Sequence, residues 1–312
     1  MKVRYLSEPG EKKESGRIIR KPAGEDFWYA GLRGGALVAA VGDWASNLMG
    51  GKYRDPETAE ALEQDRKTEY NGGVIGAQTA RRVIAGSGST GDSLIGEINQ
   101  EMERKYRQLG IDVRDPRYRF AGFLAHLYVT PDKITATCIG DVKVYSNGRH
   151  VIGEETEVQR FMNMIRREYI MQTGDFEGAY DILKPFIADQ QRFQNTAHHK
   201  LSYAAITGAP IPEGVVVKSM PCPSYNTLIF SDGFVVARPR KWHLRAGQMK
   251  TVEDMENNLV EAYEIDPHRC NAYPAVGELL DDRTAVEIAD MDDWKNFAVE
   301  KVQPTFKRKS SK

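Results

Sequence analysis

Cysteine and histidine are scarce in this sequence. Its 312 residues include three cysteines and six histidines, and they are not grouped at the spacing of a zinc site. Three scattered cysteines are also too few for a disulfide framework, so we expect buried or inert thiols. Zinc-binding and disulfide-stabilised classes are therefore disfavoured, and a reducing, cytoplasmic setting is expected.

Long apolar runs and an excess of either charge are also absent. No stretch of 18 apolar residues could span a membrane, and the first residues, Met1–Glu8, lack the apolar core of a signal peptide. The 43 lysines and arginines nearly balance the 44 acidic residues, giving a net charge of −1. Composition therefore gives no general reason to expect nucleic acid or an acidic membrane as a partner.

The sequence does repeat one pairing, of an apolar strand with a carboxylate. Three apolar runs end at Asp43, Asp141 and Asp232, and a fourth strand, Ala285–Ile288, follows Asp281. A strand brings the side chain at its end to the edge of a sheet on a rigid support. If the four strand ends meet, their carboxylates form a pocket that cations would have to stabilise.

Such a pocket has a defined chemistry. Carboxylate oxygens are the ligands that Mg²⁺ and Mn²⁺ prefer. Three or four aspartates can hold two cations with one carboxylate bridging, and the cations can activate a water for in-line attack on phosphorus. Each aspartate taken alone is more often a turn or cap residue, so only the set indicates metal-dependent phosphoryl transfer or hydrolysis. The set does not specify the substrate.

The periodicities predict an α+β fold. Apolar stripes predict helices over 74–85 and 92–110, and Asn147-Gly148 predicts a tight hairpin turn. The polar stretch 44–70 is expected to be a long functional or mobile loop. Strands, two helices, strands, helices and strands follow in that order, without the regular alternation of a parallel sheet. We therefore expect two antiparallel sheets packed face to face, with helices outside.

Five acidic motifs follow one another along the chain. They are Glu25-Asp26, Val41-Gly42-Asp43, Ile139-Gly140-Asp141, Phe230-Ser231-Asp232-Gly233 and Asp281-Asp282-Arg283-Thr284. Their order and separations resemble the metal-dependent protein phosphatases of the protein phosphatase 2C family. The resemblance covers roughly residues 20–290, and the five motifs in order are more specific than any one of them.

This resemblance implies a four-layer α/β/β/α sandwich, with helices on both outer faces. It implies hydrolysis of phosphoserine or phosphothreonine in a protein by a water that bridges two Mg²⁺ or Mn²⁺ ions. Residues 20–290 would form the catalytic domain, with a flap-like insert at about 154–200 near the site. Residues 1–19 would be a leader or edge strand, and residues 291–312 a basic tail.

The resemblance also assigns two metal positions. Asp43 would bridge the two metals, and Asp232 and Asp281 would hold the first. The backbone carbonyl of Trp44, helped through waters by Glu25-Asp26, would hold the second. Asp141, together with Asp232, would serve a weaker third metal.

The sequence departs from the family at three places. Trp44 stands where glycine is expected, and Met49-Gly50-Gly51 is displaced. The histidine that some members use as a general acid has no counterpart. The phosphate-binding arginine is shifted: Lys21 stands four residues before Glu25, with Arg20 beside it. Either could neutralise phosphate, although lysine lacks the bidentate fork of arginine.

These departures leave two alternatives to a protein phosphatase. The chain could be a catalytically weak, phosphatase-like regulatory or binding module, although none of the core aspartates is missing. It could also hydrolyse a small phosphorylated metabolite. The expected partner is a phosphorylated protein, and the oligomeric state is left open.

Overall fold

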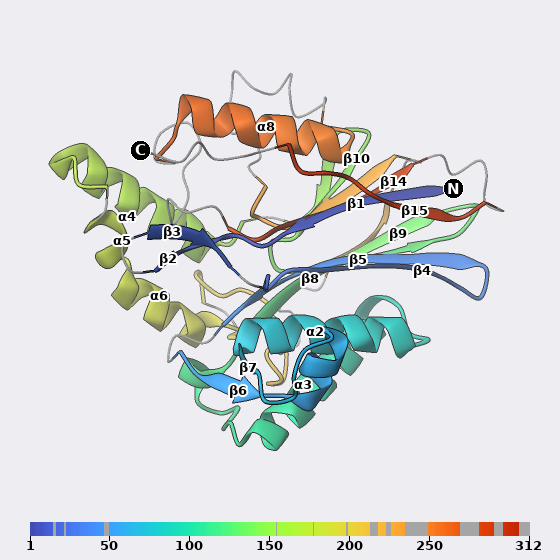
Figure 1. Cartoon of the computed structure of the whole chain (residues 1–312), viewed down its shortest axis with the longest axis horizontal. Helices are drawn as coiled ribbons and strands as arrows, with labels where there is room; N and C mark the ends of the chain where they lie inside the picture. The colour runs from blue at the N-terminus through green and yellow to red at the C-terminus, as the bar shows by residue number, and fades with distance from the viewer. Residues whose placement is uncertain are drawn as a thin grey trace.

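Figure 1 shows the chain as a computed structural model, with two sheets lying between helices. The structure describes residues 1–14, 17–21, 23–46, 50–153, 155–176, 178–197, 199–212, 218–222, 226–234, 249–268, 281–289 and 296–305, without the side chains of 11–14, 17–20, 218–220 and 222. Within these ranges, no helix is long and apolar enough to cross a membrane.

Two large sheets form the centre of the fold. One has the order β11 (Arg149–Ile152), β10 (Lys143–Ser146), β13 (Thr227–Phe230), β14 (Arg283–Ala289), β1 (Lys2–Glu8) and β15 (Ala298–Lys301). The other has the order β12 (Lys218–Cys222), β9 (Ile134–Ile139), β8 (Ala121–Val129), β5 (Ala36–Ala45) and β4 (Phe27–Arg33). Neighbouring strands are antiparallel, except that β15 is parallel to β1.

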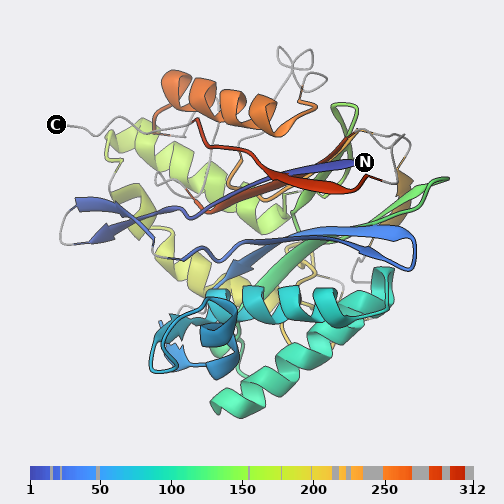
Figure 2. The same cartoon turned by 45° about the vertical axis from the view of Figure 1, so that its right-hand side comes forward.

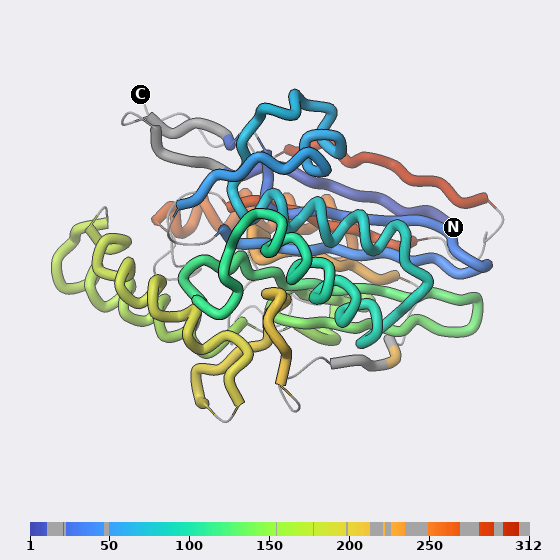
Figure 3. Tube along the Cα trace, turned by 90° about the horizontal axis from the view of Figure 1, so that it is seen from below, coloured from blue at the N-terminus to red at the C-terminus, as the bar shows by residue number. Residues whose placement is uncertain are grey.

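Helices cover the outer faces of both sheets. The helices are α1 (Pro56–Ala61), α2 (Gly72–Gly86), α3 (Gly91–Leu109), α4 (Glu157–Thr173), α5 (Gly178–Asp181), α6 (Lys184–Gln190), α8 (Val252–Ile265) and the 3₁₀ turns η1 (Pro116–Tyr118) and η2 (Gln191–Phe193). Helix α2 contacts β4, β5 and β8, whereas α8 contacts β1 and β14 on the other side (Figure 2). From below, α2 and α3 lie in front of the strands (Figure 3). The predicted α+β class with antiparallel sheets is confirmed.

Strand β5 separates two apolar cores because successive side chains point to opposite faces of a sheet. Leu37, Ala39 and Val41 belong to the core between the two sheets. Val38, Ala40 and Trp44 belong to the core under α2 and α3. The same alternation puts Asp43 on the inter-sheet side and Trp44 on the helix side.

Trp44 has room because two glycines line its position. A Cβ atom on Gly76 of α2 would lie 2.3 Å from the indole, and one on Gly122 of β8 would lie 2.4 Å from it. The indole is only 2% exposed. The bulky residue that departs from the family motif is therefore a core residue, and its side chain is kept away from Asp43.

Gly122→Ala should destabilise the fold by about 2 kcal/mol, because the new methyl group would overlap the indole in a packed core. Gly96→Ala is the matched control, since a Cβ there meets nothing within 4 Å and α3 should become slightly more stable. Urea unfolding measures both. If the packing explanation holds, Trp44→Phe should recover part of the loss in the double variant.

Strands near both chain ends belong to the six-stranded sheet. β1, expected to be a leader or an edge strand, lies inside the six-stranded sheet between β14 and β15. β15 also belongs to that sheet, so the fold continues past residue 290; residues 306–312 of the predicted tail lie outside the described part. The stretch expected to be a loop, 44–70, contains α1 and most of a two-stranded sheet, β6 (Lys52–Arg54) and β7 (Glu69–Asn71). A second small sheet pairs β2 (Glu11–Glu14) with β3 (Arg17–Arg20).

Candidate metal centre

The sheet topology brings the four acidic strand ends to one end of the molecule. β5 and β9 are both antiparallel to β8, so they run in the same direction. Gly42 and Ile139 both pair with Leu124, which puts Asp43, inside β5, and Asp141, two residues after β9, at the same end. β13 runs into Ser231 and Asp232, beside the start of β14, and the Ser231 N–H donates to the carbonyl of Thr284 at 2.9 Å. β13 also contacts β5 in the facing sheet.

The carboxylates are close enough to change one another's ionisation. Burial raises the pKa of Asp43 well above its usual value, and the charges of Asp232, Asp26, Asp141 and Asp281 raise it further. Burial, followed by Asp141 and Asp281, raises the pKa of Asp232 to about 7. The structure therefore brings the predicted aspartates into a single interacting cluster.

Glu25 and Asp26 enter the cluster from the segment before β4. Ser231 Oγ donates to Asp26 Oδ2 at 2.5 Å and accepts from the Thr284 N–H at 3.0 Å. Ser46 Oγ donates to Glu25. Burial raises the pKa of both acids. Hydroxyl donors thus hold two carboxylates that would otherwise repel their neighbours.

Asp282 organises the same end, although the sequence analysis gave the ligand role to Asp281. Its side chain is 3% exposed, whereas that of Asp281 is 61% exposed. Asp282 Oδ1 accepts from the Gly10 N–H at 2.5 Å, and Oδ2 accepts from the Glu25 N–H. Its carboxylate therefore fixes the backbone that presents Glu25, and no local sequence signal revealed this long-range contact.

Gly233 explains the glycine of the Ser-Asp-Gly motif. A Cβ atom at Gly233 would lie 1.8 Å from the carbonyl oxygen of Asp282. Only glycine allows the turn after β13 to approach the start of β14 so closely. This contact sets Asp232 beside the segment that carries Asp281.

Lys21 is a cation at the side of the cluster formed by Glu25, Asp281 and Asp282. Its Nζ lies 3.2 Å from Asp282 Oδ1, 3.6 Å from Asp281 Oδ1 and 3.7 Å from Glu25 Oε2. Burial lowers the pKa of Lys21, but the carboxylates of Asp281, Asp282 and Glu25 outweigh it and the pKa is raised. The predicted basic residue therefore lies at the acidic end, whereas the side chain of Arg20 is outside the described part.

Two further residues contact Asp141 and were missed from the sequence. Gln159 Nε2 of α4 donates to Asp141 Oδ2 at 2.6 Å, and Lys143 Nζ donates to the Asp141 carbonyl at 3.1 Å. Asp141 Oδ1 is buried without a hydrogen-bond partner. Lys143 counteracts the rise in the pKa of Asp232. Neither residue belongs to an acidic motif, so the motif pattern could not find them.

The carboxylate oxygens of this cluster are suited to binding a hard divalent cation. The side chains that gather here are carboxylates, several with a raised pKa, and one buried carboxylate oxygen lacks a donor. Among the residues that the structure describes, no three Asp, Glu, His or Cys side chains already have the arrangement of a formed metal site. The cluster is therefore a set of neighbouring oxygen donors that a cation would still have to draw together.

Comparisons with solved structures find bacterial serine/threonine phosphatases. The enzyme PstP/Ppp of Mycobacterium tuberculosis is 16% identical, over 92% of this chain and 99% of that chain, with a TM-score of 0.49. Stp1 of Staphylococcus aureus is 11% identical, over 92% and 94%, with a TM-score of 0.47.

Two of the similar structures contain metals. The PstP catalytic domain, again 16% identical with a TM-score of 0.47, was solved with two manganese ions. RsbX, solved with magnesium, is 12% identical over 89% of this chain and 90% of that chain, with a TM-score of 0.42. A scan of family models and a search of curated proteins gave no match.

The metal-free protein should lose stability as the pH rises. Asp232 binds its proton more tightly in the folded chain than in the unfolded one, because its pKa is raised from 3.8 to about 7. The stability that this bound proton contributes is therefore fully present below pH 4. It is lost as the pH rises towards 7, which lowers the free energy of unfolding by about 1–3 kcal/mol. Thermal unfolding in chelator at pH 5 and pH 8 measures this. Asp232→Asn should flatten the dependence, and an equally steep curve for that variant would contradict the assignment.

Proposed function

We propose that the chain is a metal-dependent phosphatase that hydrolyses phosphoserine or phosphothreonine in proteins. The observation that carries the proposal is the meeting of Asp43, Asp141 and Asp232 at one end of two facing sheets, where Asp141 and Asp232 raise the pKa of Asp43 and Asp141 also raises that of Asp232. A cluster of buried carboxylates is unfavourable without cations, so its presence favours a site for Mg²⁺ or Mn²⁺. The fold proposed with this function is the four-layer sandwich expected from the motifs.

Each carboxylate has a proposed role. Asp43 would be shared by the two ions, Asp232 and Asp281 would help to hold the first, and the Trp44 carbonyl, with Glu25 or Asp26 acting through waters, would help to hold the second. Asp141, with Asp232, would serve a weaker third position. These residues come from strand ends and turns that the sheets hold rigidly, so they can bind the ions with little rearrangement of the backbone.

The ions would supply the chemistry that the side chains lack, by activating water and by offsetting negative charge on the phosphoryl oxygens. The chain would hold the phosphate in place beside them. Lys21 Nζ lies 3.6 Å from Asp281, whose side chain is 61% exposed. Its ammonium group would turn from the carboxylates to the phosphate once the ions neutralise those carboxylates.

The test is turnover of a phosphopeptide with Mn²⁺, compared with turnover in chelator. Metal-stimulated release of phosphate, with a preference for phosphopeptides over sugar phosphates, is the expected result. Preference for a sugar phosphate would favour the metabolite alternative. Mn²⁺ binding without turnover of either substrate would favour a regulatory module.

Lys21→Met should lower kcat/KM for a phosphopeptide by about 30-fold, which corresponds to about 2 kcal/mol for a lost charged hydrogen bond. Lys21→Arg is the matched control, because it keeps the charge and should retain most of the activity. Steady-state kinetics at saturating Mn²⁺ give the comparison. If Lys21→Met keeps full activity while binding Mn²⁺ normally, another group binds the phosphate.

A further inference from the structure

The amide of Gln159 is held in one orientation at the start of α4. Its Oε1 atom accepts from both the N–H and the hydroxyl of Thr156, each at 2.9 Å. Thr156 Oγ1 accepts in return from the Gln159 N–H at 3.2 Å, which completes a capping box. A flipped amide would lose both bonds to its carbonyl oxygen, so the NH₂ group has to point away from the cap.

That NH₂ group donates to Asp141. The bond from Gln159 Nε2 to Asp141 Oδ2 is 2.6 Å long, and Asp141 is 1% exposed. Because Oδ2 is taken by the amide, Oδ1 is the oxygen left without a donor. Gln159 therefore sets which oxygen of Asp141 remains available to a cation, and it does so from a helix outside the two sheets.

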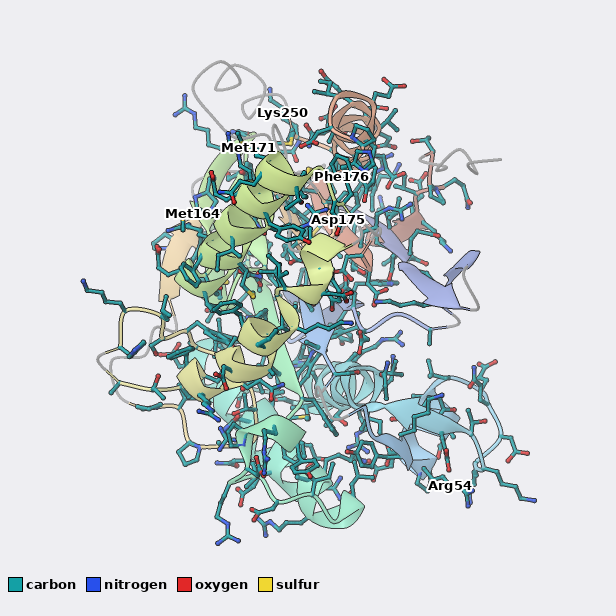
Figure 4. All side chains as sticks on the ribbon, turned by 90° about the vertical axis from the view of Figure 1, so that its left-hand side faces the viewer. Arg54, Met164, Met171, Asp175, Phe176 and Lys250 are labelled. Carbon is teal, nitrogen blue, oxygen red and sulfur yellow. The ribbon has the colours of Figure 1, made fainter. Side chains whose placement is uncertain are left out.

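One face of helix α4 is buried against the rest of the protein. Val158, Met162 and Arg166 are buried, and Arg166 Nη2 donates to the His268 carbonyl at 2.8 Å. On the opposite face, Met164 and Met171 are 55% and 62% exposed and point outward (Figure 4). The Gln159 bond is thus a direct polar link between the inner face of α4 and the acidic cluster.

We propose that Gln159 is a positioning residue that couples the start of α4 to cation binding at Asp141. The inference depends on the proposed function, because it requires that the cluster bind cations. A hydrogen bond that holds Asp141 in the binding orientation removes an ordering cost from cation binding. By the reciprocity of coupled equilibria, a cation bound at Asp141 must also stabilise the cap of α4.

Calorimetric titration with Mn²⁺ tests whether Gln159 supports cation binding at Asp141. Gln159→Leu should weaken the lowest-affinity Mn²⁺ step by on the order of tenfold, since one hydrogen bond to a charged group is lost, while the tighter steps stay unchanged. Arg160→Gln is the matched control: Arg160 is on the same turn but pairs with Glu155 and Glu157 instead of Asp141. It should bind Mn²⁺ as the wild type does.

The outcomes separate this inference from the proposed function. Equal Mn²⁺ binding by the wild type and Gln159→Leu would overturn the positioning role and leave the metal centre standing. A wild-type chain that binds no Mn²⁺ would overturn the metal centre, and the coupling with it. If Gln159→Leu and Arg160→Gln both weaken every Mn²⁺ binding step, α4 acts only through the general stability of the protein. That result would also overturn the positioning role of Gln159.

Hydrogen exchange of the unaltered protein tests whether a bound cation stabilises the cap of α4. This measurement does not depend on how the variants fold. Saturating Mn²⁺ should slow exchange of the Gln159 and Arg160 amides several-fold. The amides of α8, which packs on β1 and β14 of the six-stranded sheet, serve as the internal reference. No change at the start of α4 under saturating Mn²⁺ would overturn the coupling.

Discussion

Asp43→Asn should reduce Mn²⁺-stimulated phosphopeptide hydrolysis by at least about 1000-fold, because one residue is proposed to touch both ions. An amide oxygen carries no charge, so neither ion would keep its full electrostatic attraction. Loss of a shared ligand also changes the separation of the two ions, on which in-line attack depends. Single-turnover kinetics at saturating Mn²⁺ measure the effect on the chemical step.

The matched control for this substitution is Asp132→Asn. Asp132 is an exposed aspartate in the turn between β8 and β9, at the opposite end of the same sheet. It should leave activity unchanged. The metal-free Asp43→Asn protein should unfold a few degrees higher than the wild type, since one buried repelling charge is gone. Activity within tenfold of the wild type would remove Asp43 from the bridging position.

The expected gain in stability distinguishes a site built for cations from a cluster built for folding. In a structural cluster, removing an acid leaves its partners unsatisfied and lowers stability. Asp43 has a raised pKa because of burial and four neighbouring carboxylates, so its charge opposes the metal-free fold. Function and stability are therefore in conflict at this residue, as expected where a ligand completes the structure.

Local signals in the sequence predicted the framework of the site well. The stripe ending at Gly110 became α3, and Gly110 has the left-handed φ of 71° that stops a helix. Asn147 and Gly148 both have positive φ, as the predicted hairpin turn requires. These features depend on residues within four positions of one another, so a single sequence contains them.

The supports of the site depend on contacts across the chain, and the sequence did not reveal them. Asp282 bonds to the backbone at Gly10, 272 residues away. Gln159 lies on α4, outside every acidic motif, and donates to Asp141, 18 residues before it. Trp44 departs from the glycine expected in the motif, and its indole is accommodated by Gly76 of α2 and Gly122 of β8. In each case, the meaning of a residue was decided by a partner that no local pattern identifies.

The stretch predicted as a loop illustrates the same point through a buried charge. α1 begins after Asp55, whose carboxylate accepts from the Thr58 N–H at 3.1 Å. Asp55 is buried, and its counter-ion is Lys105 of α3, which is 0% exposed and lies 2.9 Å away. Lys105 also contacts Glu57 Oε2 at 2.6 Å. The buried side chain of Lys105 therefore links α3 to the start of α1 through two ion pairs.

Lys105→Met should destabilise the protein by about 3–5 kcal/mol, because it leaves the Asp55 carboxylate buried without a counter-ion. Urea unfolding at pH 7 gives the change in the free energy of unfolding. Arg107→Met is the matched control: Arg107 pairs with Glu103 at the exposed surface of the same helix and should cost less than about 1 kcal/mol.

The double variant Lys105→Met with Asp55→Asn decides whether the buried charge causes that loss. Asparagine keeps an oxygen that can cap α1 but carries no charge, so the double variant should recover much of the stability lost by Lys105→Met alone. Failure to recover would mean that Lys105 acts through its packed aliphatic stem. In that case α1 would be held by apolar contacts, and the ion pair would contribute little to the fold.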